Sequence, residues 1–330
     1  MISLNDLERG EALDILRKIL LPRYNRRFRK HLSVLSVCIG LKLKREKEIK
    51  SESHGLCLKV IVHRKGIFNE KEDIPAEIFF NHPVHGKIRV ETDVEDVGKL
   101  TLNSGRVLSP KLEAGGLTGS IACALAHSQK KRFLLTARHV LDEVDGGENN
   151  VKVTWSKAGL TGEGTYNNAS NWYFDKDPTN KQSGYVDVGL VDMANISNDA
   201  IYYPGSDKIP HLDSTVDWTQ CEDHDLVRIC GYHQDVYAKY SGQLATGTQI
   251  FIDGQGVPYW RMITYFLDQD NMTREGDSGA AVIDEKTETL VGIHLGLRET
   301  NHGYCAIALC SGDILSFLKA RLGGEFKIIS

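Results

Sequence analysis

The chain has 330 residues, of which 41% are hydrophobic and 25% charged, so it is a globular chain able to bury two or three hydrophobic cores. Its net charge of −4 gives no reason to expect nucleic acid or an acidic membrane as a partner. No basic segment followed by an apolar run opens the chain, and no eighteen consecutive residues are apolar. Neither an export signal nor a membrane span is therefore expected.

The cysteines are odd in number and scattered, without a Cys-X-X-Cys pair. They are Cys38, Cys57, Cys123, Cys221, Cys230, Cys305 and Cys310. This usage is typical of reduced thiols and predicts a cytoplasmic location rather than a disulfide framework or a zinc site. No metal and no other cofactor is expected.

Residues 1–104 are predicted to form a small α+β domain. Asn5 or Asp6 can cap a helix whose apolar residues fall largely on one face and which should end before Pro22. Strand-like runs follow at residues 33–43, 55–63 and 87–91. No chemistry is visible in this part, which leaves regulation through a protein partner as its expected role.

A basic run follows the predicted helix and comprises Arg23, Arg26, Arg27, Arg29 and Lys30. One interpretation is a solvated linker or helix face, because such charge runs are common on surfaces. The other is a docking surface for an acidic partner.

Residues 105–330 are predicted to form the second domain, after a linker rich in Gly, Ser and Pro. Its first strand is expected near residues 117–126, next to the apolar run 133–135 that leads to His139. A histidine placed directly after a strand can serve as a general base.

Asp187 lies inside a second apolar run, residues 185–191. Asp192 is an alternative acid, but it lies five residues later, which turns it to the other face of the same strand. Asp142 and Asp145 are too close to His139 along the chain to be favoured.

The sequence Gly276-Asp277-Ser278-Gly279 has the features of a nucleophile loop. A serine hydroxyl needs a base beside it and N–H donors aimed at the oxyanion that it creates. Gly276 can take backbone angles that let its N–H point with that of Ser278 into one pocket. The alternative is an ordinary turn before a strand, since Gly, Asp and Ser all favour turns.

Short strands separated by Gly-containing turns are expected across residues 225–266, as in all-β barrels. Ser311 is expected to cap a final helix that Gly323 ends.

Together these motifs resemble those of the trypsin- and chymotrypsin-like serine proteases, over roughly residues 115–322. Thr136–His139 is similar to their Thr-Ala-X-His, Asp187–Val191 to their Asp-Ile-Ala-Leu-Leu, and Gly276–Gly279 to their nucleophile loop. The order His, Asp, Ser also matches. The resemblance implies a mainly β fold, a chymotrypsin-like double β-barrel with a C-terminal helix.

The same resemblance implies roles for individual residues. His139, Asp187 and Ser278 would form the catalytic triad, and Gly276 and Ser278 the oxyanion hole. Asp277, which precedes the nucleophile, is expected to find Arg274, Arg138 or a backbone donor, because a buried unpaired carboxylate is costly.

The amino-terminal part is similar to the domain that precedes the protease domain in some bacterial trypsin-like proteins. The residues that carry this weaker likeness are Gly40, Val60–Lys65, Ile74-Pro75 and Thr92–Val94.

Substrate preference is expected to depend on Met272, Thr273 and His294. In trypsin an aspartate six residues before the nucleophile attracts Lys or Arg, but Met272 occupies that position here. Thr273 and His294 are similar to the pair with which glutamyl endopeptidases and picornavirus-type cysteine proteases hold a Glu or Gln side chain. A hydroxyl and an imidazole suit a side-chain oxygen. The alternative for His294 is a structural strand histidine bonded to a neighbour.

The sequence therefore predicts a serine endopeptidase acting on protein or peptide substrates through an acyl-enzyme, with Glu or Gln preferred at P1. Residues 1–104 are expected to regulate it, and one alternative is an enzyme that residues 1–100 hold silent until a partner or peptide binds. Hydrolysis of esters uses the same machinery and stays open as another alternative. The alternative from another class is a catalytically silent protease fold used as a binding module.

Overall fold

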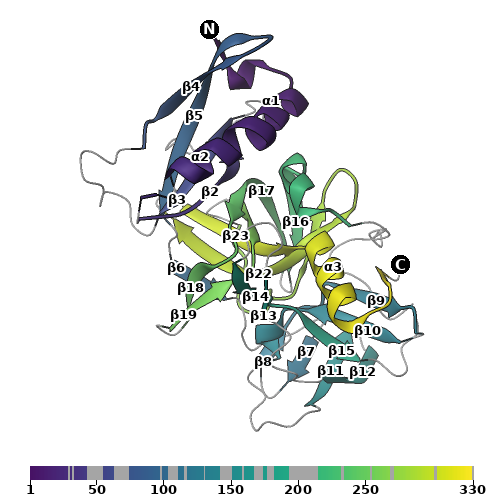
Figure 1. The fold of residues 1–330 in the computed structure, drawn as a ribbon. Coiled ribbons are helices and arrows are strands. Elements are labelled where there is room, and N and C mark those ends of the chain that lie inside the picture. Colours follow the sequence, from purple (N-terminus) through teal and green to yellow (C-terminus); the bar gives the residue numbers. More distant parts are fainter. Residues whose placement is uncertain are drawn as a thin grey trace.

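The computed structural model describes residues 1–28, 30–31, 33–42, 55–62, 74–96, 99–102, 111–114, 117–129, 131–141, 151–157, 160–166, 174–176, 182–192, 215–231, 234–252, 255–267, 271–300 and 303–328. Strands dominate, and α-helices occur near both ends of the chain (Figure 1). Among the helices in these ranges, none combines the length and the apolar character that crossing a bilayer requires.

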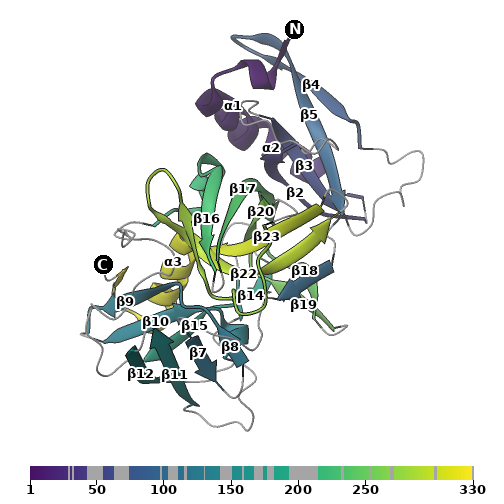
Figure 2. The same ribbon diagram turned by 180° about the vertical axis from the view of Figure 1, so that it is seen from behind.

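The amino-terminal part of the chain, here called the amino-terminal domain, contains a five-stranded sheet covered by helices on one face (Figures 1 and 2). Four strands follow the order β1-β5-β3-β2, and β4 pairs with β5. The strands are β1 (Ile2–Ser3), β2 (Val34–Leu41), β3 (Leu56–Val62), β4 (Glu77–His82) and β5 (Gly86–Asp96). Strands β2 and β3 lie within the predicted runs, and β5 extends beyond the predicted run 87–91. Strands β1 and β4 were not expected.

The helical segment runs past Pro22, so the predicted end before this proline is wrong. It consists of η1 (Leu4–Asp6), α1 (Arg9–Ile15), the π-helical turn η2 (Leu16–Leu20) and α2 (Leu21–Phe28). A proline cannot donate the usual backbone hydrogen bond, and the wider π turn directly before it accommodates that loss. Buried Tyr24 and Phe28 then anchor the extra turns in the domain core.

The predicted caps of this helix are also wrong. Ser3 caps η1, accepting the N–H of Asn5, while the Asp6 side chain accepts the N–H of Ser3 at 2.8 Å. Glu8 precedes α1 without a side-chain cap.

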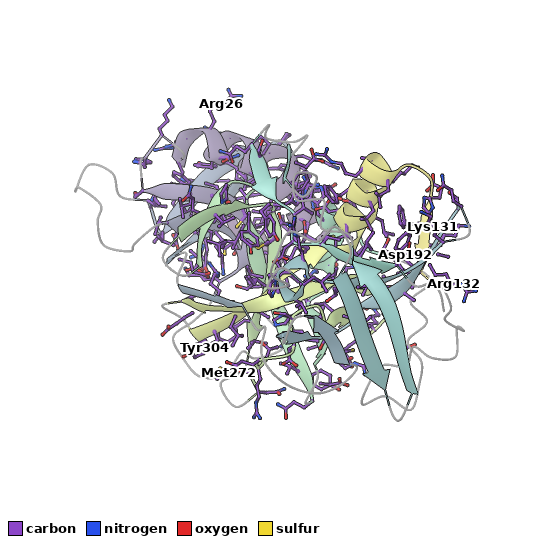
Figure 3. The ribbon with its side chains drawn as sticks, turned by 90° about the horizontal axis from the view of Figure 1, so that it is seen from below. Arg26, Lys131, Arg132, Asp192, Met272 and Tyr304 are labelled. Carbon is purple, nitrogen blue, oxygen red and sulfur yellow. The ribbon has the colours of Figure 1, made fainter. Side chains whose placement is uncertain are left out.

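The basic residues of α2 lie at the surface. Arg23, Arg26 and Arg27 are exposed, and Arg26 projects from the outer side of the amino-terminal domain (Figure 3). Arg29 of the same predicted run lies outside the described residues.

An eight-stranded sheet, here called the first sheet, holds the segment that leads to His139. Its order is β24-β9-β10-β15-β12-β11-β7-β8. The bounds are β7 (Lys111–Ala114), β8 (Leu117–Gly119), β9 (Cys123–His127), β10 (Arg132–Thr136), β11 (Val151–Lys157), β12 (Leu160–Tyr166), β15 (Gly189–Asp192) and β24 (Phe326–Ile328). The predicted first strand is split into β8 and β9, and β9 pairs with β10 as expected.

The carboxyl barrel is a closed ring of six strands in the order β21-β16-β17-β20-β23-β22, closed by pairing of β21 with β22. Its strands are β16 (Leu226–Cys230), β17 (Asp235–Leu244), β20 (Met262–Leu267), β21 (Ala281–Asp284), β22 (Leu290–Thr300) and β23 (Gly303–Cys310). Strand β6 (Lys99–Leu102) adds to β22. A smaller sheet contains β13 (Phe174–Lys176), β14 (Ser183–Tyr185), β18 (Thr248–Ile252) and β19 (Gln255–Tyr259).

The final helix α3 (Ser311–Leu322) packs beside the barrel and ends at Gly323, as predicted. Its N-cap is Cys310, however, and not Ser311. The Ser311 hydroxyl instead donates to the Leu290 carbonyl at 2.5 Å and accepts the N–H of Val216 at 3.1 Å. A buried tertiary pairing has replaced the predicted local cap.

One hydrophobic core joins the first sheet, the barrel and α3, and includes Leu134, Val188, Ile293 and Phe317. The two β bodies therefore meet along a packed interface. This arrangement confirms the predicted fold class, a mainly β, chymotrypsin-like double barrel with a C-terminal helix and a preceding α+β unit. All seven cysteines are buried and free.

Candidate active site

The nucleophile loop precedes β21 and is held by glycine conformations. Gly276 and Gly279 have φ angles of +94° and +89°, a region that residues with a Cβ rarely adopt. A Cβ at Gly279 would lie 2.2 Å from Thr136 Oγ1, so only glycine fits there. The loop is fastened to the first sheet by the Ser120 N–H, which donates to the Ser278 carbonyl at 2.7 Å. These constraints place Ser278 at the junction of the two β bodies.

His139 reaches the same junction from the first sheet. Strand β10 is buried over its last three residues, and the short 3₁₀ turn η3 (Arg138–Val140) follows it. The imidazole Nε2 lies 2.8 Å from Ser278 Oγ. The predicted histidine and serine are thus within hydrogen-bonding distance.

Asp187 lies two residues before β15, which pairs with β10. Its Oδ2 lies 2.7 Å from His139 Nδ1, and its Oδ1 accepts the backbone N–H of His139 at 2.9 Å. Tyr259 donates a third hydrogen bond to this carboxylate at 3.3 Å. The imidazole is therefore held with one nitrogen toward the acid and the other toward the serine.

The carboxylate of Asp187 is completely buried. Burial alone would raise its pKa, but His139 and the hydrogen bonds around it lower the pKa below the ordinary value of 3.8. Asp187 is therefore ionised at neutral pH and can stabilise an imidazolium at position 139.

Ser278 has a second acceptor besides the histidine. Its hydroxyl donates to the backbone carbonyl of Leu295 at 2.7 Å, and the side chain has no exposed surface. Leu295 sits at an irregularity of β22, where the register with β23 shifts between His294 and Gly296. The hydroxyl carries a single proton, so the Leu295 carbonyl and His139 Nε2 compete for it.

The predicted oxyanion donors lie on either side of Asp277. The Gly276 carbonyl accepts the Ser120 hydroxyl at 2.8 Å, which fixes the orientation of the Gly276–Asp277 peptide. Within the described part of the chain, neither the Gly276 nor the Ser278 N–H donates to a backbone carbonyl. Both donors can therefore serve a ligand oxygen.

Asp277 finds a backbone donor, as predicted. Its Oδ2 accepts the N–H of Arg274 at 2.7 Å, and its own N–H donates to the Arg274 carbonyl at 3.1 Å. This pair of bonds closes the loop before Ser278.

The three residues predicted to set substrate preference lie close to the nucleophile along the chain or across the sheet. His294 accepts the Gly279 N–H at 2.8 Å through its carbonyl and donates to the Ala280 carbonyl at 2.9 Å. Its side chain is fully buried, Thr273 is buried, and Met272, labelled in Figure 3, is half-buried.

The His294 imidazole is neutral at physiological pH. Burial, and next the charge of His139, lower its pKa to about 3, although a hydrogen bond to the backbone of Ile307 opposes the shift. That bond agrees with the alternative of a structural strand histidine, while the backbone pairing to the nucleophile loop keeps the residue beside the site.

Asp192 does not reach the site. It is paired with Phe133 at the far end of β10, and Figure 3 shows it on the side of Lys131 and Arg132. Asp142 and Asp145 lie outside the described residues. Sequence reasoning missed Tyr259, Ser120 and the Leu295 carbonyl, because no local pattern indicates which residue meets the triad across a sheet.

Comparison with known proteins found solved structures that resemble the chain at low identity. No protein-family model and no curated protein matches the chain. Solved structures that resemble it include the Nocardiopsis protease NAPase, at 13% identity and a TM-score of 0.42, covering 71% of this chain and 98% of that one. Thermobifida fusca protease A has 12% identity and a TM-score of 0.43, covering 67% and 96%.

An inactivated protease paralogue of the scabies mite, S-I1, has 12% identity and a TM-score of 0.31, covering 61% and 94%. Likenesses at these identities do not bear on the chemistry, which has to be argued from the geometry of the site.

Proposed function

We propose that the chain is a serine endopeptidase that hydrolyses peptide bonds through an acyl-enzyme. The observation that carries this proposal is the continuous hydrogen-bonded series from Asp187 Oδ2 to His139 at 2.7 Å and from His139 to Ser278 Oγ at 2.8 Å. Such a series activates a hydroxyl that is otherwise a weak nucleophile at neutral pH.

In this mechanism Ser278 Oγ attacks the peptide carbonyl while His139 Nε2 takes the hydroxyl proton. The N–H groups of Gly276 and Ser278 hold the oxyanion. His139 then gives its proton to the departing amine, and the acyl-enzyme forms. Water, deprotonated by the same imidazole, attacks the ester. The bond to Ser278 Oγ then breaks, His139 returns the proton to that oxygen, and the carboxylic acid leaves, while Asp187 keeps the ring oriented.

The test is labelling of the purified full-length protein with a fluorophosphonate, followed by mapping of the modified peptide. We expect covalent modification of Ser278 in the wild type and in Ser128→Ala, a surface control, and none in Ser278→Ala. Cleavage of a peptide library should follow the same pattern. Equal cleavage by wild type and Ser278→Ala would refute the assignment.

A catalytically silent binding module is the second candidate. The observation that favours it is the Ser278 hydroxyl, which is fully buried and already donates to the Leu295 carbonyl. Absence of fluorophosphonate labelling in folded wild-type protein would favour this function over the protease.

We infer in addition a preference for Glu or Gln at P1, with Thr273 and His294 near the side chain and Met272 replacing the acid that would attract Lys or Arg. Support comes from the position of His294, whose backbone is bonded to Gly279 and Ala280, the two residues that follow Ser278. A P1 scan should favour Glu and Gln over Lys and Phe, and Thr273→Val, which keeps the volume but loses the hydroxyl, should reduce that preference. A preference for Lys or Phe would contradict it.

We further propose that residues 1–104 act as a separate regulatory domain ahead of the protease domain, residues 105–330, and that they bind a protein partner. The exposed arginines of α2 fit an acidic surface. The seven free cysteines support a reducing compartment such as the cytoplasm.

A further inference from the structure

Strand β22 has an edge beside the nucleophile that an added strand already covers. Along one edge it pairs with β23 from Gly292 to Thr300. Along the other edge, β21 covers only the start, up to Ile293. Beyond that point the partner is β6, whose residues pair with Gly296–Glu299. Figure 1 shows β6 at this side of the barrel, next to β18.

The covered edge begins one residue after the carbonyl that contacts the nucleophile. Leu295 accepts the Ser278 hydroxyl at 2.7 Å, and the next residue, Gly296, pairs with Leu102. Because the pairing is antiparallel, β6 runs from Lys99, opposite Glu299, toward the nucleophile. Its carboxyl end thus approaches Ser278 in an extended conformation.

Extended peptides bind proteins by adding a strand to an open sheet edge, with backbone hydrogen bonds that do not depend on sequence. When the scissile carbonyl of an extended peptide lies at Ser278, the residues before that carbonyl lie beside the edge of β22 that follows Leu295. That peptide and β6 would need the same N–H and C=O groups of residues 296–299. Both cannot pair there at once.

The amino-terminal domain holds β6 at this edge through a buried ion cluster. Strand β5 ends at Asp96, shortly before β6 begins, and Glu95 of β5 forms an ion pair with Arg298 of β22. Arg298 is the residue that pairs with Leu100 of β6. Lys59 Nζ lies 2.8 Å from Glu95 Oε2 and 3.8 Å from Asp93 Oδ2. Two cations thus meet two anions with almost no solvent exposure.

Other contacts fix the same domain to the barrel. Lys59 donates to the Ser241 hydroxyl at 3.1 Å, and Tyr240 donates to the Ile39 carbonyl at 2.9 Å. A Cβ at Gly40 would lie 2.4 Å from the Ser241 carbonyl oxygen, so the two backbones approach closely. These contacts therefore join the domain that precedes β6 to β17 of the barrel.

We propose that β6 is an intramolecular occupant of the peptide-binding edge of β22, anchored by the Glu95–Arg298 pair, and that an extended substrate binds only after β6 has left. This inference rests on the proposed protease function. It identifies the extended backbone on the amino side of the scissile bond as the part of the substrate that competes with β6.

Proline substitutions in β6 test the competition. Along a strand, consecutive N–H groups point to opposite sides, so only one of Leu100 and Thr101 donates to β22. Leu100→Pro and Thr101→Pro are each other's matched controls, because each inserts one proline but only one removes a ladder bond. Unfolding curves establish that both variants fold.

The readouts are KM and kcat/KM for a peptide with six residues before the scissile bond, and the labelling rate of Ser278 by a small fluorophosphonate. We expect one of the two variants to lower KM for the long peptide at least five-fold, with the labelling rate unchanged in both. If Ser278 is labelled in both folded variants but KM for the long peptide is unchanged in both, this inference is wrong while the proposed function stands. No labelling in any variant would refute the proposed function and this inference with it.

Amide hydrogen exchange tests the same idea without altering β6. In Ser278→Ala protein, which cannot turn over substrate, saturation with the long peptide should speed exchange in residues 99–102 at least ten-fold. A truncated peptide beginning at the scissile bond should leave exchange there unchanged. Peptide binding with unchanged or slower exchange of β6 would overturn the inference.

Discussion

The buried carboxylate of Glu95 is the clearest point at which to test how the amino-terminal domain is joined to the carboxyl barrel. The change is Glu95→Gln, which keeps the shape of the side chain but removes its charge. Lys59 and Arg298 would then lose the carboxylate that pairs with both of them, inside a cluster that is almost inaccessible to solvent, while Asp93 would still lie 3.8 Å from Lys59. An uncompensated buried charge is strongly destabilising.

The magnitude follows from two arguments. Burial alone would raise the pKa of Glu95, but Arg298 and Lys59 lower it from 4.5 to about 2. At 1.36 kcal/mol per pKa unit, this shift corresponds to ~3 kcal/mol of stability at neutral pH. Breaking a buried ion pair by removing one partner typically costs about 3–5 kcal/mol. We therefore expect the free energy of unfolding to fall by about 3 kcal/mol.

The pH dependence has a definite sign. A carboxylate with a lowered pKa contributes stability above its unfolded value, near 4.5, and that contribution is lost as the pH falls toward 2. The difference in the free energy of unfolding between wild type and Glu95→Gln should thus be largest at neutral pH and should shrink as the pH falls from about 4.5 to about 2.

The assay is urea unfolding of the full chain at several pH values. Glu91→Gln is the matched control, because Glu91 lies on the same strand and pairs with Lys42 at 3.2 Å, but both side chains are more than a quarter exposed. An exposed pair contributes about 0–1 kcal/mol. If Glu95→Gln destabilised the protein no more than Glu91→Gln, the buried cluster would not join the two bodies as described.

Three further predictions concern the site. Asp187→Asn should lower kcat about 10⁴-fold with the fold intact, because the amide no longer holds the imidazole tautomer; peptide-cleavage kinetics measure this, and unchanged kcat would contradict the triad. Gly279→Ala should destabilise the protein by about 2–5 kcal/mol in urea, since its φ is +89° and a Cβ would meet Thr136. The control Gly10→Ala, with open space around it, should stabilise by up to about 1 kcal/mol, and equal effects would contradict the reasoning. Between pH 6.5 and about 3, His294 binds a proton in the unfolded chain but not in the folded one. The free energy of unfolding should therefore decrease by about 1.4 kcal/mol for each unit by which the pH is lowered. His294→Gln should remove that slope in acid-unfolding curves, and an unchanged slope would show that this imidazole is not buried in its neutral form.

The strands around His139 and Asp187 could be predicted because each is a short apolar run beside a polar residue. A buried strand must be apolar on both faces, and a polar residue at its end then stands out. The Gly-Asp-Ser-Gly loop could be predicted for a similar reason, since left-handed backbone angles require glycine wherever they occur. Both signals are local, and each depends on a few neighbouring residues.

Other features could not be read in this way. Pro22 is a strong local signal for a helix end, yet the π turn before it and the burial of Tyr24 and Phe28 extend the helix. Ser311 has the composition of a cap, but its hydroxyl is taken by Leu290. In both cases tertiary packing outweighed a local preference, of about 1 kcal/mol for a cap and about 3 kcal/mol for a proline inside a helix.

The sequence alone therefore determined the chemical groups of the site and their order along the chain, because hydroxyl, imidazole and carboxylate are set by residue type. Only the tertiary structure decided that the Ser278 hydroxyl meets the Leu295 carbonyl, that β6 lies on the edge of β22, and that Glu95 meets Arg298 from a position 203 residues away. The physical reason is strand register. A shift by one residue would turn every side chain to the opposite face, and that register is fixed by the packing of the whole barrel rather than by any short segment.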